Sequence, residues 1–554
     1  MAGDQRDDLT SLGIFLGYEK NIPLRNEGLG RLLGYVVKGW CSSEGHPITI
    51  ACPYWLESDV RTLLDDHQVA SGAYRVLATK RPVLLRISQS TYSGIHKLKV
   101  FAKQVKSSVR RRMGKEKTRL PAGGKRGGDE DKVLLRKLAN VRHRLVDNVR
   151  SSKGVAEFLC NMFVACVAIL IVVLIGLTAV LLAWPVALAL IFIKTLKKKR
   201  RKYLAKRSGK RKKLQQHRVS RRTLRELNEL VELVNQQKSV SLWLIPTPFW
   251  PEGNRIQGRT AVVCPDLVLH EFPTQFSDPG IAPIYNRILG SLQGAERLIT
   301  YSDYTRRAQL IESVGIPECR IRVVPHGRAD LSTYLKLGRA TLPYDEQREV
   351  AFELLRGYQV STLWSVPYWN DVRFDTTSYV FYSSQYRPYK NIYSLVRAID
   401  HLRRTTSDAP RLILTCKRNP DSEMAHYITS RGLEAFVLFA NNIPSELLAA
   451  MNCLAKLSVN PSLFEGGFPF TFSEAYSVGT PSVMSRIPVV TEVIRDAGLQ
   501  KAMLFDPYDY QSMAQRISWG IQHREQLLAH QRPVYEAMPT WNSVSQAYAQ
   551  AIAN

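Results

Sequence analysis

The chain has 554 residues, of which 45% are apolar and 23% charged, and its formal net charge is +29 at pH 7. This length exceeds one ordinary domain, and this composition excludes a wholly disordered chain. Most of the charge lies in residues 103–150, with 16 Lys and Arg against 5 Asp and Glu, and in residues 194–225, with 17 against none. Because the remainder is nearly neutral, we expect no nucleic-acid partner, since such proteins spread basic charge over a binding face.

The first 102 residues predict the first part of a doubly wound α/β domain. The apolar runs SLGIFLGY and ITIACP are typical of buried strands, and the stretch LLGYVVKGWCSSEG between them has helical periodicity. A loop that contains Gly28, Gly30 and Gly34 is expected before this helix. Its GxGxxxG spacing is one residue longer than the dinucleotide fingerprint, so the glycines alone are a weak signal.

Residues 103–235 predict a membrane-associated insertion, because the apolar run 158–193 contains no charged residue. As one helix this run would be about 54 Å long, against a hydrocarbon layer of roughly 30 Å. We therefore predict a transmembrane hairpin or a re-entrant wedge that turns near Gly176, with a single tilted helix as the alternative. Basic flanks stay on the cytoplasmic side and attract anionic phospholipids, so both flanking domains are expected at the cytoplasmic face of the inner membrane.

The eight cysteines form no CxxC pair and accompany no clustered histidines. Reduced, structural cysteines are therefore expected, without a metal site. The acidic N-terminal sequence MAGDQRDD predicts that no signal peptide precedes the fold.

The alternation of strands and helices resumes after the insertion. The runs SLWLIP, TAVVCPDLV, RLITYSD and IRVVP predict that residues 236–330 complete the sheet begun in residues 1–102. An irregular interdomain region is expected over 331–377, a second parallel sheet over 378–535, and a final helix over 536–554 that returns toward the first domain. Two such domains would face a cleft at the carboxyl ends of their strands, where open α/β folds bind ligands.

The sequence PSLFEGGFPFTFSEAYSVGTP, residues 461–481, combines features of a nucleotide site. Glu465 is expected at the end of a strand, and Gly466 and Gly467 would let backbone amides approach a ligand closely. A helix that begins near residue 471 would direct its N-terminal amides toward a diphosphate. Glu474, on the first turn of this helix, could then bind the two hydroxyls of a ribose.

Two basic residues lie at the mouth of the first strand of the second domain. In the sequence YRPYKN, Arg387 and Lys390 could neutralise phosphate charge as a leaving group departs. Together with the glutamates, they predict a pocket for a nucleotide diphosphate sugar.

Several ordered motifs resemble those of the retaining glycosyltransferases of family 4, also described as glycosyl transferases group 1, of the membrane-anchored bacterial polysaccharide type. PSLFEGG and FSEAYSVGTPSVMS resemble the family signature, and KN at 390–391 resembles its donor-side lysine. RLITYSDYTRR, RIRVVPHGRAD and VCPDLV resemble first-domain motifs, and MPTWNSVSQAYAQAI resembles the final helix. The resemblance covers about 1–100 and 236–554. It implies a GT-B fold, with two Rossmann-like domains facing a cleft.

The resemblance also implies roles for individual residues. Glu465 would contact the transferred sugar, Glu474 the ribose, and Arg387 and Lys390 the diphosphate. The implied reaction moves a hexose with retention, from GDP-mannose in preference to UDP-glucose, to a lipid-linked or growing polysaccharide acceptor. No metal and no other cofactor is expected, because two cations and a helix end offset the leaving charge. The predicted site residues are Glu465, Arg387 and Lys390 (catalytic), Glu474, Gly466, Gly467, Phe468, Pro469 and Ser473 (donor side), and Gly28, Gly30 and Asp266 (acceptor or sugar side).

Some features depart from the family pattern. Eight residues instead of seven separate Glu465 from Glu474, so the loop is expected to bulge by one residue. Pro265 replaces the histidine that usually precedes Asp266, which leaves Asp266 with either a sugar contact or a role in a turn. His326 is expected to pack in the linker.

Two other functions stay open from the sequence. One is a sugar-nucleotide enzyme of the same fold, an epimerase or a phosphorylase, although a soluble substrate gives no reason for a membrane segment. The other is a non-catalytic scaffold of a polysaccharide assembly complex, against which the intact glutamates and Lys390 argue. The oligomeric state, including a homo-oligomer, is also open.

Overall fold

The computed structural model describes residues 11–20, 28–43, 47–82, 154–190, 221–276, 281–336, 342–361 and 366–554, with the single positions 22, 24, 148, 149 and 152. The described chain divides into two compact units, Met1–Leu77 with Val231–Asn554, and Ala78–Leu230. The first unit contains both predicted α/β domains except for residues 78–102, which fall in the second unit. Most of the two basic blocks lies outside the described residues.

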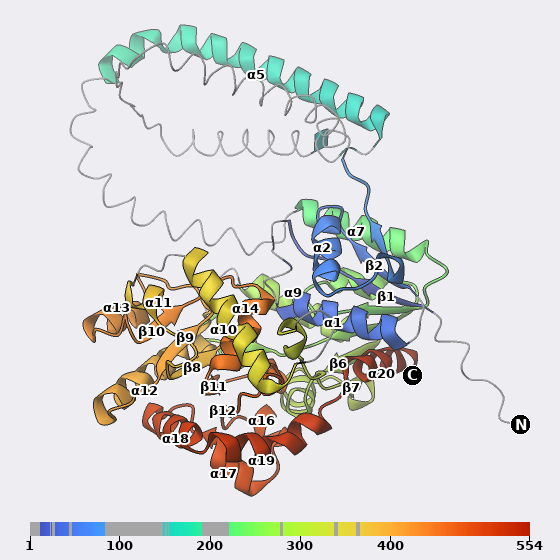
Figure 1. Cartoon of the computed structure of the whole chain (residues 1–554). Helices are drawn as coiled ribbons and strands as arrows, with labels where there is room; N and C mark the ends of the chain where they lie inside the picture. The colour runs from blue at the N-terminus through green and yellow to red at the C-terminus, as the bar shows by residue number, and fades with distance from the viewer. Residues whose placement is uncertain are drawn as a thin grey trace, which may run out of the picture. The chain divides into compact units, whose positions relative to one another are not determined.

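The first domain is built on a seven-stranded sheet in the order β3-β2-β1-β4-β5-β6-β7 (Figure 1). Strand β1 pairs in parallel with β2 and β4, and the parallel pairing continues through β5 and β6 to β7. The chain order reverses between β1 and β4, which is where ligands bind in a doubly wound sheet. The strands are β1 (Leu12–Phe15), β2 (Ile48–Cys52), β3 (Tyr74–Ala78), β4 (Leu242–Ile245), β5 (Arg259–Val263), β6 (Arg297–Thr300) and β7 (Ile321–Val323).

The strands predicted in this domain are confirmed, but the glycine loop is not. Gly28, Gly30 and Gly34 all lie within α1 (Gly28–Ser43) instead of before it. A Cβ atom at Gly30 would lie 1.9 Å from the carbonyl oxygen of Leu24, and one at Gly34 would lie 2.3 Å from the ring of His67. These two glycines therefore permit close packing around α1.

Helices complete the first domain around its sheet. The last helix of the chain, α20, packs on α1, where the hydroxyl of Ser545 donates a hydrogen bond to the carbonyl of Val36 (2.9 Å). In Figure 1 the red helix α20, near the C-terminus, lies beside the blue helix α1. The helices are α2 (Glu57–Asp66), η2 (Ser71–Ala73), η4 (Pro251–Arg255), α8 (Val268–Glu271), α9 (Ile281–Gly294), the π-helical η5 (Thr305–Ser313), η6 (Glu318–Arg320) and α20 (Trp541–Ala553).

The second domain has a six-stranded sheet in the order β10-β9-β8-β11-β12-β13, again with parallel pairs. Its order reverses between β8 and β11. The predicted strands are confirmed: β8 (Tyr379–Tyr382), β9 (Arg411–Leu414), β10 (Val437–Phe439), β11 (Leu457–Asn460), β12 (Ser482–Ser485) and β13 (Leu504–Phe505). Two parallel α/β sheets within one unit confirm a GT-B-like fold.

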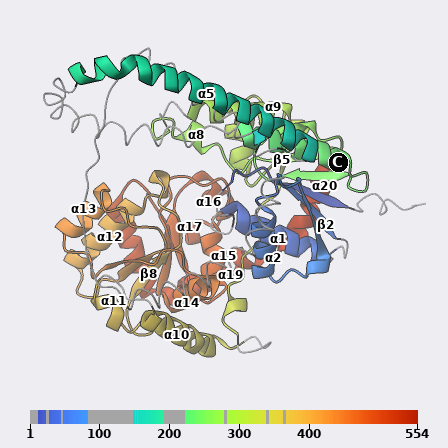
Figure 2. The same ribbon diagram turned by 90° about the horizontal axis from the view of Figure 1, so that it is seen from above.

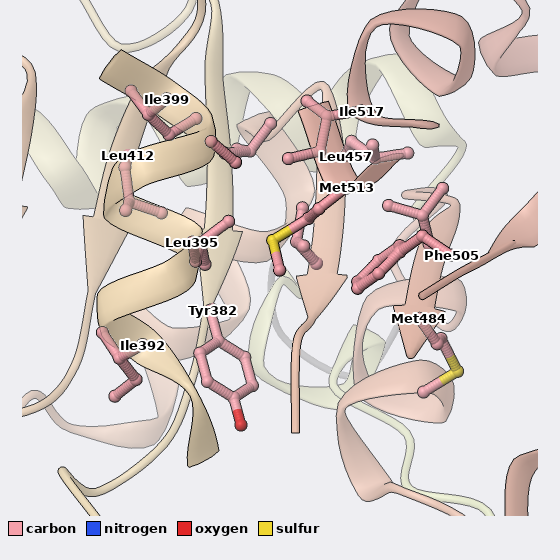
Figure 3. Packing of buried hydrophobic residues seen from close by; sticks show 14 of the residues in the cluster. Tyr382, Ile392, Leu395, Ile399, Leu412, Leu457, Met484, Phe505, Met513 and Ile517 are labelled. Atoms are coloured by element: carbon pink, nitrogen blue, oxygen red, sulfur yellow. The ribbon is translucent and has the colours of Figure 1, made fainter. Parts of the chain in front are cut away.

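Alternation along β8 explains why both faces of this sheet are covered. Val380 and Tyr382 belong to the core under α12 (Ile392–Thr405) and α18 (Tyr510–Gln522). Tyr379 and Phe381 belong to the core under α10 (Tyr344–Ser361) and α14 (Ser445–Leu454). Figure 3 shows Tyr382 in the first of these cores. The helices are α12 (Ile392–Thr405), α13 (Glu423–Ser430), α14 (Ser445–Leu454), α15 (Phe470–Tyr476), α16 (Pro488–Val493), α17 (Ala497–Met503), α18 (Tyr510–Gln522) and α19 (Arg524–Ala537), with the short turn η8 (Pro388–Lys390).

The region 331–377, predicted to be irregular, contains helices. They are η7 (Ser332–Tyr334), α10 (Tyr344–Ser361) and α11 (Tyr368–Asp371). The prediction was wrong for α10 because its buried face is a narrow stripe of Gln347, Ala351 and Leu355, which lacks a strong apolar period.

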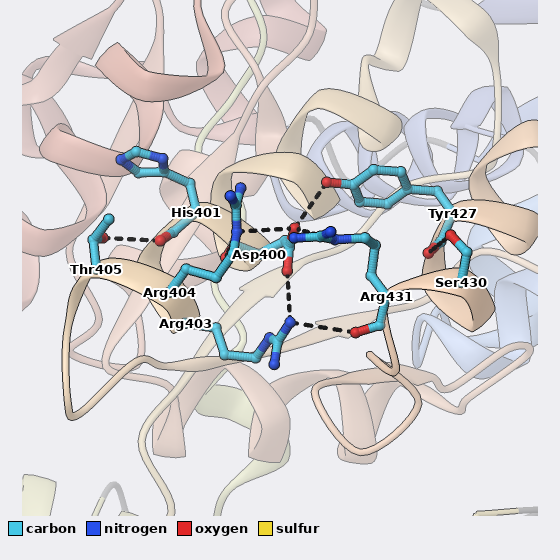
Figure 4. A network of polar contacts seen from close by, with 8 residues as sticks. All are labelled: Asp400, His401, Arg403, Arg404, Thr405, Tyr427, Ser430 and Arg431. Carbon is cyan, nitrogen blue, oxygen red and sulfur yellow. Dashed lines mark hydrogen bonds and ion pairs between the residues drawn. The ribbon is translucent and has the colours of Figure 1, made fainter.

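A buried carboxylate stabilises the second domain between α12 and α13. Asp400 has no exposed side-chain surface and pairs with Arg403 (3.0 Å), Arg404 (3.4 Å) and Arg431 (3.1 Å). The hydroxyl of Tyr427 donates a further hydrogen bond of 2.9 Å to it. Figure 4 shows these groups converging on Asp400. Burial raises the pKa of Asp400, but the bonds from Tyr427 and the arginines outweigh burial and hold that pKa below its usual value.

In the second unit the structure describes α5 (Val155–Leu190) and the beginning of α7 (Arg221–Asn235). Helix α5 is one unbroken ribbon (Figure 2). It continues through Gly176, so the predicted hairpin turn is wrong. One glycine costs a helix only about 1 kcal/mol, and the surrounding leucine and alanine favour helix.

The structure describes side chains of α5 only as far as Val173. Within the described residues, no helix is both long enough and apolar enough to pass through a membrane.

Candidate active site

A large cleft lies between the two α/β domains of the first unit. Its volume is about 1590 Å³. Single ligand pockets usually enclose about 300–1,000 Å³, so the cleft has room for more than one small molecule. The second domain contributes the loops after β8 and β11, which are neighbours at the reversal of its sheet. The first domain contributes α2, through Asp59, Leu63 and Asp66, together with His67.

An ion pair lies in the lining of the cleft. Nζ of Lys390 lies 2.6 Å from Oε1 of Glu465, and both side chains are largely buried. The hydroxyl of Ser462 donates to the same carboxylate oxygen at 2.7 Å, and Ser462 also hydrogen-bonds the hydroxyl of Tyr382 (3.0 Å). The structure thus joins two residues that the sequence assigned to different parts of a donor.

The charge of Lys390 follows from this pairing. Burial acts to lower the pKa of Lys390, but attraction to Glu465, with contributions from Tyr382 and Tyr389, raises it above its ordinary value. Lys390 is therefore a permanent cation at neutral pH.

Local structure fixes the position of Lys390. It ends the short turn η8, and the next residue, Asn391, adopts a left-handed conformation with φ of 53° before α12 begins. Asparagine tolerates this conformation better than most residues. The side-chain amide of Asn391 donates to the carbonyl of Pro507 (2.7 Å), and the amide of Leu463 donates to the carbonyl of Tyr389 (2.8 Å). The bond from Leu463 joins the two cleft loops, and the bond from Asn391 holds the start of α12 to the segment after β13.

Arg387 and Glu474 also line the cleft. The guanidinium of Arg387 is exposed and donates a hydrogen bond to the side-chain carbonyl of Gln385 (3.0 Å). A guanidinium has five N–H donors, and this bond uses one of them. Glu474 is the fifth residue of α15, so it lies on the second turn instead of the predicted first. It is only 2% exposed. The predicted Pro469 lines the cleft beside Glu474.

Two residues predicted on the donor side face elsewhere. The hydroxyl of Ser473 accepts a hydrogen bond from the amide of Ala329 (3.0 Å) and donates to the carbonyl of Phe470 (3.1 Å). It therefore anchors the interdomain linker. Phe468 packs edge-on against Phe472 in the core of the second domain. Their donor-side role stays a prediction, and the contacts that the structure shows for them are with the linker and the core.

The two glycines after Glu465 meet the first domain. A Cβ atom at Gly466 would lie 2.0 Å from the carbonyl oxygen of Pro265, and one at Gly467 would lie 2.7 Å from Cβ of Tyr301. These glycines are therefore required for the approach of one domain to the other, a role that differs from the predicted contact with phosphate.

Asp266 lies beside this glycine loop. Its carboxylate accepts a hydrogen bond of 3.0 Å from the amide of Val268, so a turn-forming role is present in the structure. Burial raises the pKa of Asp266, while the Val268 amide and the charge of Lys390 oppose the rise. Gly28 and Gly30, the other predicted acceptor-side residues, lie on α1, and Gly30 is buried against Leu24.

His326 packs between aromatic rings where the domains meet. Its ring centroid lies 4.0 Å from that of Tyr301 and 4.3 Å from that of Phe470. Burial lowers the pKa of His326 to about 3, so its imidazole is neutral at physiological pH. This agrees with the expected packing role.

The sequence reasoning missed several cleft residues. Ser462 was part of the quoted motif, but no role was given to it. Polar residues from the loops after β9 and β10 and from the start of α14, which carry no motif, also line the cleft: Thr415, Lys417, Asn441, Asn442 and Glu446. Within the described residues, no group of His, Cys, Asp and Glu is arranged to hold a metal ion.

Comparison with known proteins identifies the second domain. Residues 370–532 match the family described as Glycosyl transferases group 1. They form a glycosyltransferase domain. This domain carries Lys390, Glu465 and Glu474.

Two curated relatives match part of the chain. The "O-antigen chain mannosyltransferase B" of Escherichia coli is 27% identical over 233 residues, which are 42% of this chain and 53% of that protein. The "MMP alpha-(1->4)-mannosyltransferase" of Mycolicibacterium hassiacum is 32% identical over 122 residues, 22% of this chain and 29% of that protein. The chain therefore spans about half, or less, of the length of the curated relatives it matches.

A solved structure shares the fold. The N-terminal domain of the trehalose-6-phosphate phosphatase of Candida albicans matches with a TM-score of 0.52 and 11% identity, covering 100% of this chain and 98% of that one. At this identity the likeness concerns the fold alone.

Proposed function

We propose that this protein is a retaining hexosyltransferase that transfers a sugar, in first place mannose, from a nucleotide diphosphate sugar to a polysaccharide acceptor. The observation that carries the proposal is the Lys390–Glu465 pair in the interdomain cleft of a chain with a glycosyl transferases group 1 domain. The cleft is large enough for a donor and an acceptor together.

The diphosphate of the donor would bind Lys390 and Arg387. Both are cations at neutral pH, and both line the cleft on the loop after β8. As the bond between the anomeric carbon and the phosphate oxygen breaks, the bonding electron pair leaves with the diphosphate. Fixed positive charge at that place stabilises the transition state. Two cations offset this charge, so we propose transfer without a metal ion.

Glu465 would face the sugar that is transferred. A carboxylate beside the anomeric carbon stabilises the positive charge of an oxocarbenium-like transition state. The acceptor hydroxyl would form the new bond to that carbon on the face that the diphosphate leaves, and its proton would pass to the departing phosphate oxygen. Glu474, which is buried and lines the cleft, would accept hydrogen bonds from the ribose hydroxyls.

The proposed sugar and acceptor rest on the relatives. Both curated relatives are mannosyltransferases by name, and one is named for an O-antigen chain. We therefore place GDP-mannose before UDP-glucose, and a lipid-linked or growing polysaccharide before a small metabolite.

We also propose that the reaction takes place at the cytoplasmic face of a membrane. The support is the surface of α5, on which Phe163 is 71%, Leu170 66% and Ile169 62% exposed. Apolar side chains exposed together mark a surface that contacts another protein or lipid. The basic blocks on both sides of this helix in sequence would attract anionic headgroups.

The test combines purified full-length protein, radiolabelled GDP-mannose, UDP-glucose and other nucleotide sugars, and a bacterial membrane lipid extract. We expect label from GDP-mannose to enter the lipid fraction. Lys390→Ala should lower turnover about 10²-fold or more, because lost charge stabilisation has this size. Lys501→Ala, which removes an exposed lysine on α17, is the matched control and should keep full turnover.

The same experiment separates the alternatives. An epimerase would change the nucleotide sugar without any lipid, and a phosphorylase would require inorganic phosphate. A scaffold would bind nucleotide or glycan and transfer nothing. Transfer that survives Lys390→Ala unchanged would contradict the role of this residue.

A further inference from the structure

The glycine loop of the second domain is hydrogen-bonded to the first domain at one carbonyl. The hydroxyls of Ser302 and Thr305 both donate to the carbonyl oxygen of Gly466, at 2.8 Å and 3.1 Å. Ser302 is 3% and Thr305 0% exposed. The hydroxyl of Ser302 in turn accepts from the amide of Thr305 (3.1 Å). The two hydroxyls also lie 3.0 Å from each other, so together with the Gly466 carbonyl they form one buried hydrogen-bonded group across the domain boundary.

A second contact joins the same segment to the second domain. Glu492 on α16 accepts hydrogen bonds from the amides of Asp303 (2.6 Å) and Tyr304 (3.0 Å) with its two carboxylate oxygens. These amides open the helical segment that continues as η5, so their N–H groups have no partner within the helix. Hydrogen bonds to a charged acceptor are stronger than neutral ones, and a carboxylate at a helix N-terminus is favoured.

The segment 302–305 and the glycine loop therefore form a contact that exists only when the two domains meet. Gly466 is the residue directly after Glu465, and Glu465 is fixed on its other side by Lys390 and Ser462. Any shift of the Gly466 carbonyl must move the backbone that carries the Glu465 side chain.

We propose that Ser302 and Thr305 are positioning residues for sugar transfer, and that Glu492 holds the segment that carries them. Domain closure brings their hydroxyls to Gly466 and sets Glu465 at the sugar. This inference rests on the proposed function, and it adds to that function a connection between closure and the placement of the carboxylate. Closure that completes a catalytic site is a common enzyme device.

The connection predicts a particular kinetic pattern. The nucleotide would be held by Lys390, Arg387 and Glu474, which all belong to the second domain and do not depend on Ser302 or Thr305. Loss of both hydroxyls should therefore lower kcat and leave the KM for the nucleotide sugar within about twofold. A misplacement of about 1 Å at the reacting centre lowers the rate on the order of 10²-fold, so we expect kcat to fall by about 10- to 100-fold.

Four variants of the full chain test the positioning role. They are Ser302→Ala/Thr305→Val, Thr305→Ser, which keeps the hydroxyl, Glu492→Ala, and Ser313→Ala as control. Ser313 donates to the carbonyl of Ala308 within η5 and is exposed, so its loss should change nothing. Thr305→Ser should keep near-normal kcat. A double variant with normal kcat, or one in which KM rises as much as kcat falls, would overturn the proposal.

Hydrogen exchange gives a readout that does not depend on transfer. In Glu492→Ala, the amides of residues 303 and 304 should exchange at least tenfold faster than in the wild type, while the β8 and β11 amides stay protected. Unchanged exchange at 303 and 304 would overturn the contact. If the wild type transfers no sugar from any donor, the proposed function fails, and the exchange result still decides whether the domains are joined here.

Discussion

The replacement of Gly466 by alanine is the sharpest single test of the interdomain contact. The new Cβ atom would lie 2.0 Å from the carbonyl oxygen of Pro265 and 2.8 Å from Cβ of Asp266. Real Cβ atoms essentially never come closer than 3.0 Å to another heavy atom, so the loop and the Pro265 turn must separate by about 1 Å. Both sides are backbone, which cannot rotate away as a flexible side chain can.

The expected result is a large loss of activity with a small loss of stability. A 1 Å displacement of the residue next to Glu465 should lower turnover on the order of 10²-fold. Overpacking inside a core costs about 1–3 kcal/mol of unfolding free energy. Here the clash is relieved when the domains part, so the free energy of unfolding should fall by less than that. Turnover is measured with labelled nucleotide sugar, and stability by urea denaturation.

Gly357→Ala is the matched control. Gly357 lies in α10, and its added Cβ would meet nothing within 4 Å. Alanine in a helix is favoured over glycine by about 0.5–1 kcal/mol, so this variant should be slightly more stable and fully active. A Gly466→Ala protein with wild-type turnover would refute the idea that this contact positions Glu465.

Two more predictions follow from the ion pairs. Glu465→Gln removes the charged partner of Lys390. Calorimetry should therefore show nucleoside diphosphate binding about three- to tenfold more tightly, a gain of up to about 1.4 kcal/mol, while the rate of sugar transfer falls. Weaker binding would show that Lys390 does not contact the diphosphate. Asp400→Asn should lower the free energy of unfolding by about 2–3 kcal/mol, below the loss from a fully buried pair because the arginines are partly exposed. The pKa of Asp400 is lower in the folded protein than in the unfolded chain, where it is about 3.9. The stabilisation by Asp400 is therefore present above about pH 3.9 and is lost as the pH falls below that value. The free energy of unfolding should thus fall more steeply with acid in the wild type than in Asp400→Asn. Exposed Asp408→Asn is the control, and identical acid limbs would contradict this linkage.

The parallel sheets could be predicted because their signal is local. SLWLIP is a short apolar run and AKLSVN alternates apolar with polar residues, and they became β4 and β11 within a residue or two. The cleft residues Lys390, Glu465 and Glu474 were predicted for a related reason. Each follows a strand of the second sheet, and a doubly wound fold brings such loops to one edge.

The features that the sequence did not predict depend on contacts between residues that are far apart in the chain. Gly466 and Gly467 must be glycines because Pro265 and Tyr301 of the other domain approach them too closely for a side chain. Pro265 lies about 200 residues earlier in the chain than Gly466. Ser473 looked like a donor ligand, but its hydroxyl is bonded to the linker at Ala329. Helix α5 did not turn at Gly176, because helix propagation across one glycine costs less than opening a turn in an apolar run.

The same contacts suggest how binding and catalysis are connected in the cleft. In the structure the charge of Lys390 is already offset by Glu465, and Ser462 donates to the same oxygen. A diphosphate would compete for Lys390 and draw it from the carboxylate, which would leave Glu465 available to the sugar. The backbone beyond Glu465 is held by Ser302 and Thr305, so the released carboxylate would keep its place only in the closed enzyme. An open protein could then bind nucleotide without presenting Glu465 correctly, and this arrangement would limit hydrolysis of the donor by water before the acceptor arrives.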